Sequence, residues 1–388
     1  MSDRARHSVS STQATSPLQQ ARRRWIKSGF GYFLRRTEAR LCKPGALPVH
    51  GIHRILVCRV NHRLGNNILI SPLLDELARL YPGAEVDIVS AGESARELFA
   101  NRFHVHRVLC FPRRMARHPL HTLQLLRDIR SAHYDLAIDP CVNSHSGRLL
   151  LGLCQARHKL GFPIDTDNRY HAHRPRHMAK CGVFLLRTAC AGTHEGDWPS
   201  LRVDLAPTEH QQGRTTLINL FPRNDANDPT PPIIGIFAHA SGNKRLPEAW
   251  WVEFVGRLQK QRPQWRLVNV LAHHGHSQLP HTVPPVYSCD LRKLASVLAG
   301  MQGFISGDCG VMHLAAAVGT PTLGLFTRSN RDRYTPYGND NRGVDLVDGN
   351  DPAHAARMAI EWLDHVTRCG GSDSVRRDAA GFATSTPT

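Results

Sequence analysis

Short apolar runs alternate with segments of helical periodicity along most of the chain. The first run, 55–60, ends in a Gly/Asn turn, after which Leu69, Leu73, Leu77 and Leu80 recur at helical spacing. Buried strands that alternate with helices of about ten to fifteen residues are typical of parallel βαβ units. The pattern therefore predicts an α/β protein.

The same alternation occurs twice. In the first half it predicts strands 55–60, 86–89, 105–111, 135–139 and 159–162, with helices 93–100, 119–132 and 146–156. In the second half it predicts strands 233–237, 265–271, 303–306, 322–326 and 344–347, with helices 247–261, 290–299, 311–318 and 352–367. Two doubly wound units leave a cleft between the carboxyl edges of their sheets.

Polar and proline-rich stretches mark the expected boundaries. The segment 205–232 combines a helix near 208–220 with a polar, Pro-rich stretch, which favours a linker. The predicted organisation is a basic, partly disordered arm 1–50, a Rossmann-like domain 51–204, the linker 205–232, a second Rossmann-like domain 233–368 and a disordered tail 369–388.

Charge adds a preference for anionic partners. Lys and Arg number 49 against 32 Asp and Glu, a net charge of +17, and the excess is concentrated in the first fifty residues. On a helix, the apolar residues of 21–41 would share one face, which either packs on the body of the protein or contacts an anionic membrane surface. The members of this face are Ile26, Phe30, Phe33, Leu34 and Leu41. No nucleic-acid-binding module is recognisable, so we expect no nucleic-acid partner.

Two further features bound the class of protein. No apolar run reaches the roughly twenty residues that cross a bilayer, and the N-terminus lacks a signal-peptide pattern. The ten cysteines are scattered without a C-x-x-C pair, which favours reduced thiols in a cytosolic protein over a disulfide or zinc framework.

The segment 304–313 carries the first candidate site. A strand leads into the Gly-flanked turn Ser306 to Gly310, and the turn opens an alanine-rich helix in which His313 lies one turn further on. Free N–H groups and the positive end of the dipole make such a helix terminus suitable for a phosphate. The alternative is an ordinary βαβ turn in which Asp308 is the N-cap.

A second turn of the same kind follows strand 233–237. Ser241, Gly242 and Lys244 precede a helix, and the Lys244 ammonium can meet a phosphate as a point charge. Two such turns in one α/β unit can hold a diphosphate from both sides. The alternative is that Lys244 and Arg245 belong to a solvated loop.

Three motifs resemble the ADP-heptose:lipopolysaccharide heptosyltransferases of glycosyltransferase family 9, over about residues 53–347. They are D-C-G-x-x-H-L-A-A-A-x-G-x-P from Asp308, S-G-N-K…P-x-x-x-W from Ser241, and L-G-N-N-x-L-x-S-P-L-L from Leu64. The resemblance implies a GT-B fold and inverting, metal-independent transfer of heptose from ADP-heptose, without a cofactor. The implied acceptor is the lipopolysaccharide core or a related glycan, reached at the cytoplasmic face of the inner membrane.

The resemblance also assigns residues. Those expected to hold the donor are Ser241, Gly242, Lys244, Asp308, Cys309, Gly310 and His313, and those expected on the acceptor side are Arg63, Asp139 and Ser146. Cys309 stands where the family often has Thr or Ser, so one hydroxyl hydrogen bond is missing. The acidic residue that relatives place near the ribose has no counterpart in 272–278.

The general base is the main departure. The family commonly has Gly-Asp where this chain has Gly65-Asn66, and an amide cannot take the proton of an acceptor hydroxyl. Three interpretations follow: Asn66 orients the acceptor while another group is the base, the chain belongs to a branch with a different arrangement, or it is catalytically weak. His62 and His145 are the replacement candidates, and Asp139 is alternatively a structural strand-end carboxylate.

Two other hypotheses compete with a transferase. Asn66 also fits a nucleotide-sugar-binding paralogue with a scaffold role, whereas an oxidoreductase is disfavoured because no strand precedes G-x-G-x-x-G. The histidines of 171–177 suggest a metal site, but the surrounding arginines oppose a dication, and a basic acceptor loop facing phosphate or a plain surface remain the alternatives.

Overall fold

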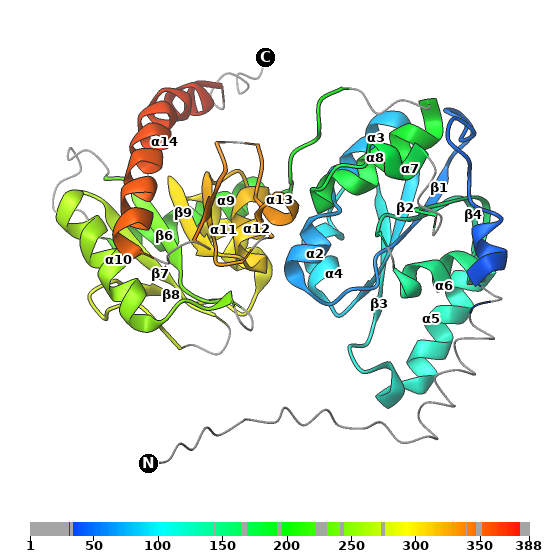
Figure 1. The fold of residues 1–388 in the computed structure, drawn as a ribbon, viewed down its shortest axis with the longest axis horizontal. Coiled ribbons are helices and arrows are strands. Elements are labelled where there is room, and N and C mark those ends of the chain that lie inside the picture. Colours follow the sequence, from blue (N-terminus) through cyan, green and yellow to red (C-terminus); the bar gives the residue numbers. More distant parts are fainter. Residues whose placement is uncertain are drawn as a thin grey trace, which may run out of the picture.

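The computed structural model contains two α/β units that lie side by side (Figure 1). The residues that it describes are 31, 34–142, 144–163, 169–191, 196–221, 231–240, 244–272, 276–328, 330–338, 340–346 and 351–380. Among them, no helix is long and apolar enough to cross a membrane.

The first unit is built on a five-stranded parallel sheet of order β3-β2-β1-β4-β5. Alternate residues of β1 point to opposite faces, so Ile55 and Val57 join one apolar cluster while Leu56 and Cys58 join another. Helices α3 and α8 cover the first face, and α5 and α6 the second. The strands are β1 (Arg54–Cys58), β2 (Glu85–Ala91), β3 (Val105–Phe111), β4 (His133–Asp139) and β5 (Gln155–Gly161). The helices are α2 (Leu64–Ile68), α3 (Ser71–Leu80), α4 (Ser94–Phe99), η1 (Met115–Arg117), α5 (Pro119–Ser131), α6 (His145–Leu153), α7 (Arg169–Ala172) and α8 (Met178–Ala191).

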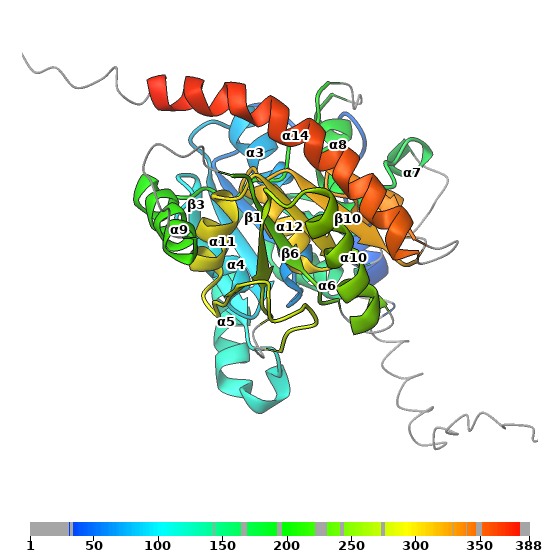
Figure 2. The ribbon, with the colours of Figure 1, turned by 90° about the vertical axis from the view of Figure 1, so that its left-hand side faces the viewer.

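The second unit is built on a six-stranded parallel sheet of order β11-β10-β9-β6-β7-β8. Helices α10 and α14 pack on one face, and α11 and α12 on the other (Figure 2). The strands are β6 (Ile233–Phe237), β7 (Arg266–Val270), β8 (Pro285–Val286), β9 (Gly303–Gly307), β10 (Thr322–Phe326) and β11 (Arg342–Asp345). The helices are α9 (Pro207–Leu220), α10 (Glu248–Gln261), α11 (Leu291–Ala299), α12 (Gly310–Ala317), α13 (Arg331–Tyr334) and α14 (Pro352–Ala380).

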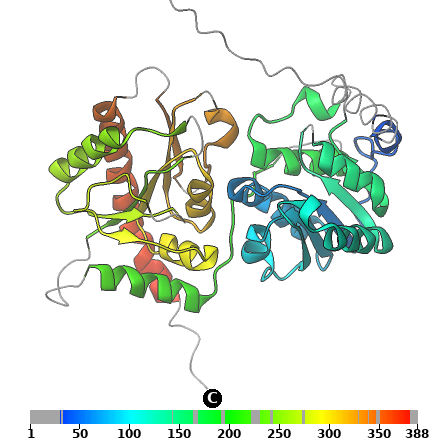
Figure 3. The ribbon, with the colours of Figure 1, turned by 90° about the horizontal axis from the view of Figure 1, so that it is seen from below.

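The chain between the two units runs along their border (Figure 3). Residues 197–206 form neither helix nor strand, and the Val203 amide donates to the Ala317 carbonyl at the end of α12. The next helix, α9, lies inside the segment expected to be a linker, yet it packs tightly on α11. A Cβ on Gly213 would lie 1.9 Å from the Ser296 carbonyl oxygen, so only glycine allows this approach.

Two local predictions differ from the structure. Gly65 and Asn66 lie within α2 rather than in an open turn. Helix α14 continues to Ala380, so the prediction of a disordered tail is wrong for 369–380. Gly370 and Gly371 do not end the helix, because extending an existing helix requires only one residue to be fixed for each new hydrogen bond.

The described part of the N-terminal arm packs on the first unit. Leu34 and Thr37 are buried, and the Cys42 amide donates to the Lys159 carbonyl on the edge strand β5. Glu38 forms an ion pair with Arg148 at 3.0 Å. These contacts favour the helix that packs on the body of the protein. Ile26, Phe30 and Phe33 of the expected apolar face lie outside the described residues.

Candidate functional site

Two helices that belong to different units begin against each other at the border. A Cβ on Gly65 of α2 would lie 2.8 Å from His313 Cδ2 and 3.3 Å from Gly310 Cα of α12. A Cβ on Gly310 would lie 2.9 Å from the Gly65 nitrogen. Each position therefore accepts only glycine at this separation. The contact places Gly310, in the predicted donor turn 306–310, against Gly65, in the predicted acceptor turn 62–66.

The N-terminus of α12 has free capacity for an anion. Cys309 is its N-cap, in extended conformation, and its side chain makes no capping hydrogen bond. The Cys309 thiol instead contacts the Ser306 hydroxyl at 3.2 Å. Burial raises the pKa of Cys309, so the thiol stays protonated and adds no negative charge. The Val311 and Met312 amides face the Cys309 sulfur, which is only a weak acceptor, so no side-chain oxygen competes with an anion for the first N–H groups of α12.

Lys244 and Asp308 are brought together as an ion pair. Lys244 Nζ lies 2.5 Å from Asp308 Oδ2, and the carboxylate is buried while the ammonium is partly exposed. The Lys244 ammonium also lies over the Tyr334 ring, 5.9 Å from its centroid. Strands β6 and β9 are neighbours, with Phe237 opposite Ser306, which places their following turns side by side. Ser241 and Gly242 lie outside the described residues.

His313 is a buried, neutral histidine at the same border. Burial, followed by the charges of His177 and Lys244, lowers the pKa of His313 to about 3. Its Nδ1 atom is buried and has no hydrogen-bond partner among the described residues. Because the ring also contacts the position of Gly65, His313 connects the donor turn to the other unit.

The basic segment 171–177 contacts the second unit through His177. His177 Nε2 lies 2.7 Å from the Thr335 carbonyl, and its ring packs edge-on against Tyr337 at 4.9 Å. Burial lowers the pKa of His177 to about 4. His171 Nε2 lies 2.8 Å from the Pro163 carbonyl. No group of three or more metal-ligating side chains occurs in the described part of the chain.

The predicted acceptor turn is open to solvent. His62 and Arg63 are exposed, and Asn66 is half-buried. The Asn66 carbonyl accepts a hydrogen bond of 3.1 Å from Arg59 Nε. The motif did not single out Asn67, which is fully buried and donates to the Ser94 hydroxyl at 2.8 Å. In the sequence, this structural role is indicated by the position of Asn67, a polar residue next to the apolar residues 68–70.

Asp139 is fully buried beneath the first turn of α6. A Cβ on Gly147 would lie 2.4 Å from the Asp139 carboxyl carbon, and the Cys141 amide donates to Asp139 Oδ1 at 3.1 Å. Burial raises the pKa of Asp139 to about 7, against the opposing charges of Arg148 and Arg59. This environment favours a structural carboxylate. By contrast, His145 and Ser146, the first residues of α6, are exposed.

The loop after β7 is described only in part. Residues 273–275 lie outside the described range, and the flanking residues 272 and 276–278 contain no carboxylate. The His276 carbonyl lies 2.6 Å from His239 Nε2, so this loop meets the turn that follows β6.

Comparison with known proteins identifies the family. The sequence signature of glycosyltransferase family 9 (heptosyltransferase) matches residues 122–359, more than half of the chain. The chain belongs to glycosyltransferase family 9. A curated relative, lipopolysaccharide heptosyltransferase 1 of Pseudomonas aeruginosa, is 30% identical over 118 residues. That match covers 29% of this chain and about a third (33%) of the relative.

Solved structures of the family show the fold. The family 9 glycosyltransferase of Veillonella parvula superposes with a TM-score of 0.63 at 16% identity, over 81% of this chain and 97% of that one. Escherichia coli ADP-heptose lps heptosyltransferase II gives 0.59 at 18% identity (80% and 99% covered), and heptosyltransferase WaaC with ADP gives 0.58 at 19% identity (81% and 99%). The two parallel sheets are thus the two halves of a GT-B fold.

Replacing Gly65 with alanine tests the contact between α2 and α12 in this family 9 protein. Since the new Cβ would overlap His313, we expect the free energy of unfolding to fall by about 1–3 kcal/mol. Thermal and denaturant unfolding would measure it. Gly256→Ala on α10 is the control, because a Cβ there meets nothing within 4 Å. Equal stability of Gly65→Ala and Gly256→Ala would contradict the contact.

Replacing Asp139 with asparagine tests the buried carboxyl. A raised folded-state pKa means that the wild type loses stability as the pH rises from 3.8, its ordinary value, to about 7, because the unfolded carboxyl ionises first. That loss is on the order of 4 kcal/mol. We expect Asp139→Asn to lack this slope and to exceed the wild type in stability at pH 8. A parallel pH dependence of the two melting temperatures would refute the assignment.

Proposed function

We propose that this protein transfers a sugar, specifically heptose, from ADP-heptose to a lipopolysaccharide-core or related glycan acceptor. The observation that supports the donor is the pairing of the uncapped α12 N-terminus with Lys244 at the border of the two units. The sugar is inferred from the relatives: the Pseudomonas relative is a lipopolysaccharide heptosyltransferase, and one Escherichia coli structure contains ADP-2-deoxy-2-fluoro heptose.

In the proposed reaction, the diphosphate lies between the α12 terminus and Lys244. The acceptor hydroxyl attacks the anomeric carbon from the face opposite the diphosphate, the bond from that carbon to the phosphate oxygen breaks, and ADP leaves with the bonding electrons. The hydroxyl proton passes to a base. Fixed N–H dipoles and one ammonium stabilise the charge that develops on the leaving diphosphate.

The ion pair with Asp308 keeps Lys244 in place before the donor binds. Its 2.5 Å contact positions the ammonium beside the turn, and a diphosphate then competes with the carboxylate for the same cation. Asp308 is buried, so it pays a desolvation cost when it loses this partner. We infer that Lys244 contacts both groups in the bound state and that Asp308 faces the sugar.

The candidates for the base differ in their exposure to solvent. Asn66 is half-buried in α2 and can orient an acceptor hydroxyl but cannot accept its proton. Asp139 has a pKa of about 7, yet it is fully buried under α6. His62 and His145 are exposed on the acceptor side. We propose one of these two histidines as the base, with Arg63 and Ser146 as acceptor contacts.

A scaffold protein that binds nucleotide sugars is the second candidate, because Asn66 replaces the expected carboxylate. Purified protein with ADP-heptose and core acceptors distinguishes the two. The transferase predicts release of ADP that depends on acceptor, whereas the scaffold predicts binding without release. If the protein neither turns over any nucleotide sugar nor binds a nucleoside diphosphate, both candidate functions are excluded.

Asn66→Asp tests which role position 66 has. If the protein is a scaffold that has lost its base, the carboxylate should create acceptor-dependent ADP release where there was none. If a histidine already serves as base, the variant should change a measurable rate little, and His62→Gln or His145→Gln should lower it by about 100-fold or more. A rate that falls in Asn66→Asp and persists in both histidine variants would exclude these assignments.

Lys244→Met tests the donor clamp. Loss of a charged hydrogen bond to phosphate should weaken ADP binding by about 10- to 100-fold, measured by calorimetry. Lys260→Met, at the exposed end of α10, is the matched control and should bind ADP as the wild type does. Unchanged ADP affinity in Lys244→Met would remove Lys244 from the donor site.

A further inference from the structure

The outer face of α5 exposes large apolar side chains to water. Leu120 is 82% exposed and Leu123 64%, and Met115 in the preceding turn is 42% exposed. Leu120 and Leu123 are three residues apart and so lie on one side of the helix. The opposite side is already buried, through Leu125 and Ile129. Leu125 and Ile129 therefore hold α5 on the sheet, and Leu120 and Leu123 are not needed for this packing.

The same outer side becomes cationic towards the end of α5. Arg127 and Arg130 follow Leu123 by four and seven residues, which keeps them on its side of the helix, and both are exposed. The stretch 112–131 contains five arginines and one carboxylate, Asp128. An apolar strip that continues into arginines is typical of a surface that lies on anionic lipid.

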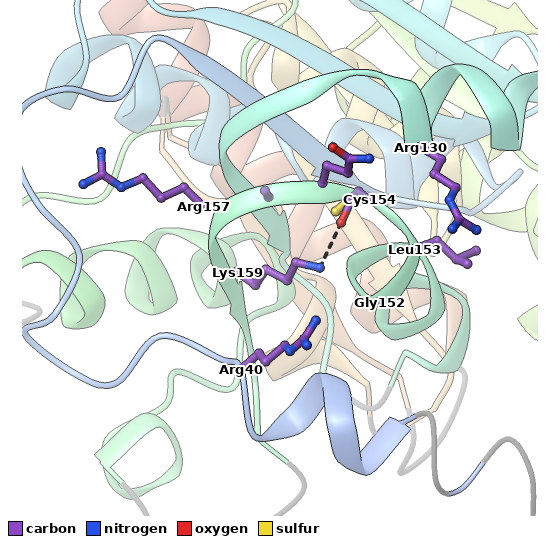
Figure 4. Close-up of a pocket in the computed structure, with 9 residues that line it drawn as sticks. Arg40, Arg130, Gly152, Leu153, Cys154, Arg157 and Lys159 are labelled. Carbon is purple, nitrogen blue, oxygen red and sulfur yellow. Dashed lines mark hydrogen bonds between the residues drawn. The ribbon is translucent and has the colours of Figure 1, made fainter.

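Arg130 also lines a hollow of about 690 Å³ at the far end of α5 (Figure 4). Three more cations line it, Arg40, Arg157 and Lys159, and no carboxylate does. A smaller adjoining hollow of about 200 Å³ shares Arg40 and Lys159 and adds Arg36. Both hollows lie on the edge strand β5, away from the border between the two units.

The cations of the hollow are short of anionic partners. Within the described part of the chain, Arg40, Arg130 and Arg157 form no ion pair within 4 Å. Lys159 is 8% exposed, and its ammonium donates to the Cys154 carbonyl at 2.9 Å, which leaves further N–H donors. The Asp135 carboxylate accepts hydrogen bonds from the backbone amides of His53 and Arg54. The charge of Arg157 acts in the same direction as these bonds and lowers the pKa of Asp135, but the two side chains form no ion pair within 4 Å.

A simpler role for these cations is to complement helix ends. The last residues of α6 lie at the hollow, and Arg130 is in the last turn of α5, where a positive charge is favoured. This accounts for Lys159 and Arg130. Arg40 is favoured for the same reason, because it follows the helical residues 34–38. This role does not account for Arg157, which lies within β5 and forms no ion pair within 4 Å in the described part of the chain.

We propose that the outer side of α5 and the hollow together dock the protein on an anionic lipid surface. Leu120 and Leu123 enter the interface, and the hollow takes the phosphate of a lipid headgroup. Because η1 and α5 follow the carboxyl end of β3, the leucine end lies at the sheet edge from which α2 also begins. Docking would hold the proposed acceptor turn near a lipid-anchored acceptor.

Sedimentation of the full chain with vesicles tests this surface without requiring turnover, so it can fail while sugar transfer is observed. Vesicles of phosphatidylcholine alone are compared with vesicles that also contain phosphatidylglycerol. The wild type should bind only the anionic vesicles, and less at higher salt. The double variants Leu120→Ser/Leu123→Ser and Arg130→Ala/Arg157→Ala should each bind at least about tenfold more weakly.

Matched controls change the same residue types elsewhere. Ile218→Ser/Val252→Ser removes exposed apolar side chains from α9 and α10, and Arg342→Ala/Arg357→Ala removes exposed arginines from the second unit. Both should bind vesicles as the wild type does. If controls and docking variants weaken binding equally, binding follows total charge and apolar content, and the proposed surface is wrong.

Inorganic pyrophosphate distinguishes a lipid from a free phosphate in the hollow, and Lys244→Met is used as the background because it removes the proposed donor clamp. If adding Arg130→Ala/Arg157→Ala to this background abolishes pyrophosphate binding while vesicle binding stays at the wild-type level, the hollow binds a soluble anion and the lipid proposal is overturned. It is also overturned if removal of residues 1–30 abolishes vesicle binding while both docking variants retain it. Loss in both docking variants, with melting temperatures unchanged, supports the proposal.

Discussion

The close approach of α2 and α12 is the constraint on which the candidate site depends. Gly65 and Gly310 each lack a Cβ where the other helix begins, and His313 fills the space beside them. This contact sets how far the donor turn of one sheet lies from the acceptor turn of the other. One apolar cluster continues through both units, from Val57 of the first sheet to Val268 of the second, so the separation is supported by buried packing as well.

The chemistry of the site follows from charge placed at that contact. The α12 terminus offers N–H groups that no side chain caps, and the Lys244 ammonium adds one full charge beside them. His313, at the same border, is kept neutral by burial and adds no charge of its own. The candidate acceptor residues are polar or basic except for one carboxylate, Asp139, which is enclosed. The two sides are therefore unequal: in the proposed reaction one side holds the anionic diphosphate, and an exposed histidine on the other side is the proposed base.

Sequence periodicity predicted most of the fold because both sheets are parallel and most of their strands alternate with helices of clear pattern, whereas the two-residue strand β8 and helix α8 were not predicted. The predicted bounds of strands 105–111, 233–237 and 322–326 agree with the structure. The errors fall where local signals compete with packing: the helix around Asn66 looked like a turn, and α14 continues through two glycines. The sequence predicted Lys244 and Asp308 on two turns that hold one diphosphate, whereas their ion pair depends on the adjacency of β6 and β9 that the structure shows. The burial of Asp139, the contact of His177 with Thr335 and the hollow around Lys159 were not, since each depends on residues far apart in sequence.

A crystal structure with ADP-heptose bound tests the central claim most directly. The account predicts the diphosphate at the first N–H groups of α12, with Lys244 Nζ within hydrogen-bond distance of a phosphate oxygen and the anomeric carbon facing α2. A diphosphate bound away from the α12 terminus, with the Lys244 to Asp308 contact unchanged and no phosphate near it, would contradict the account.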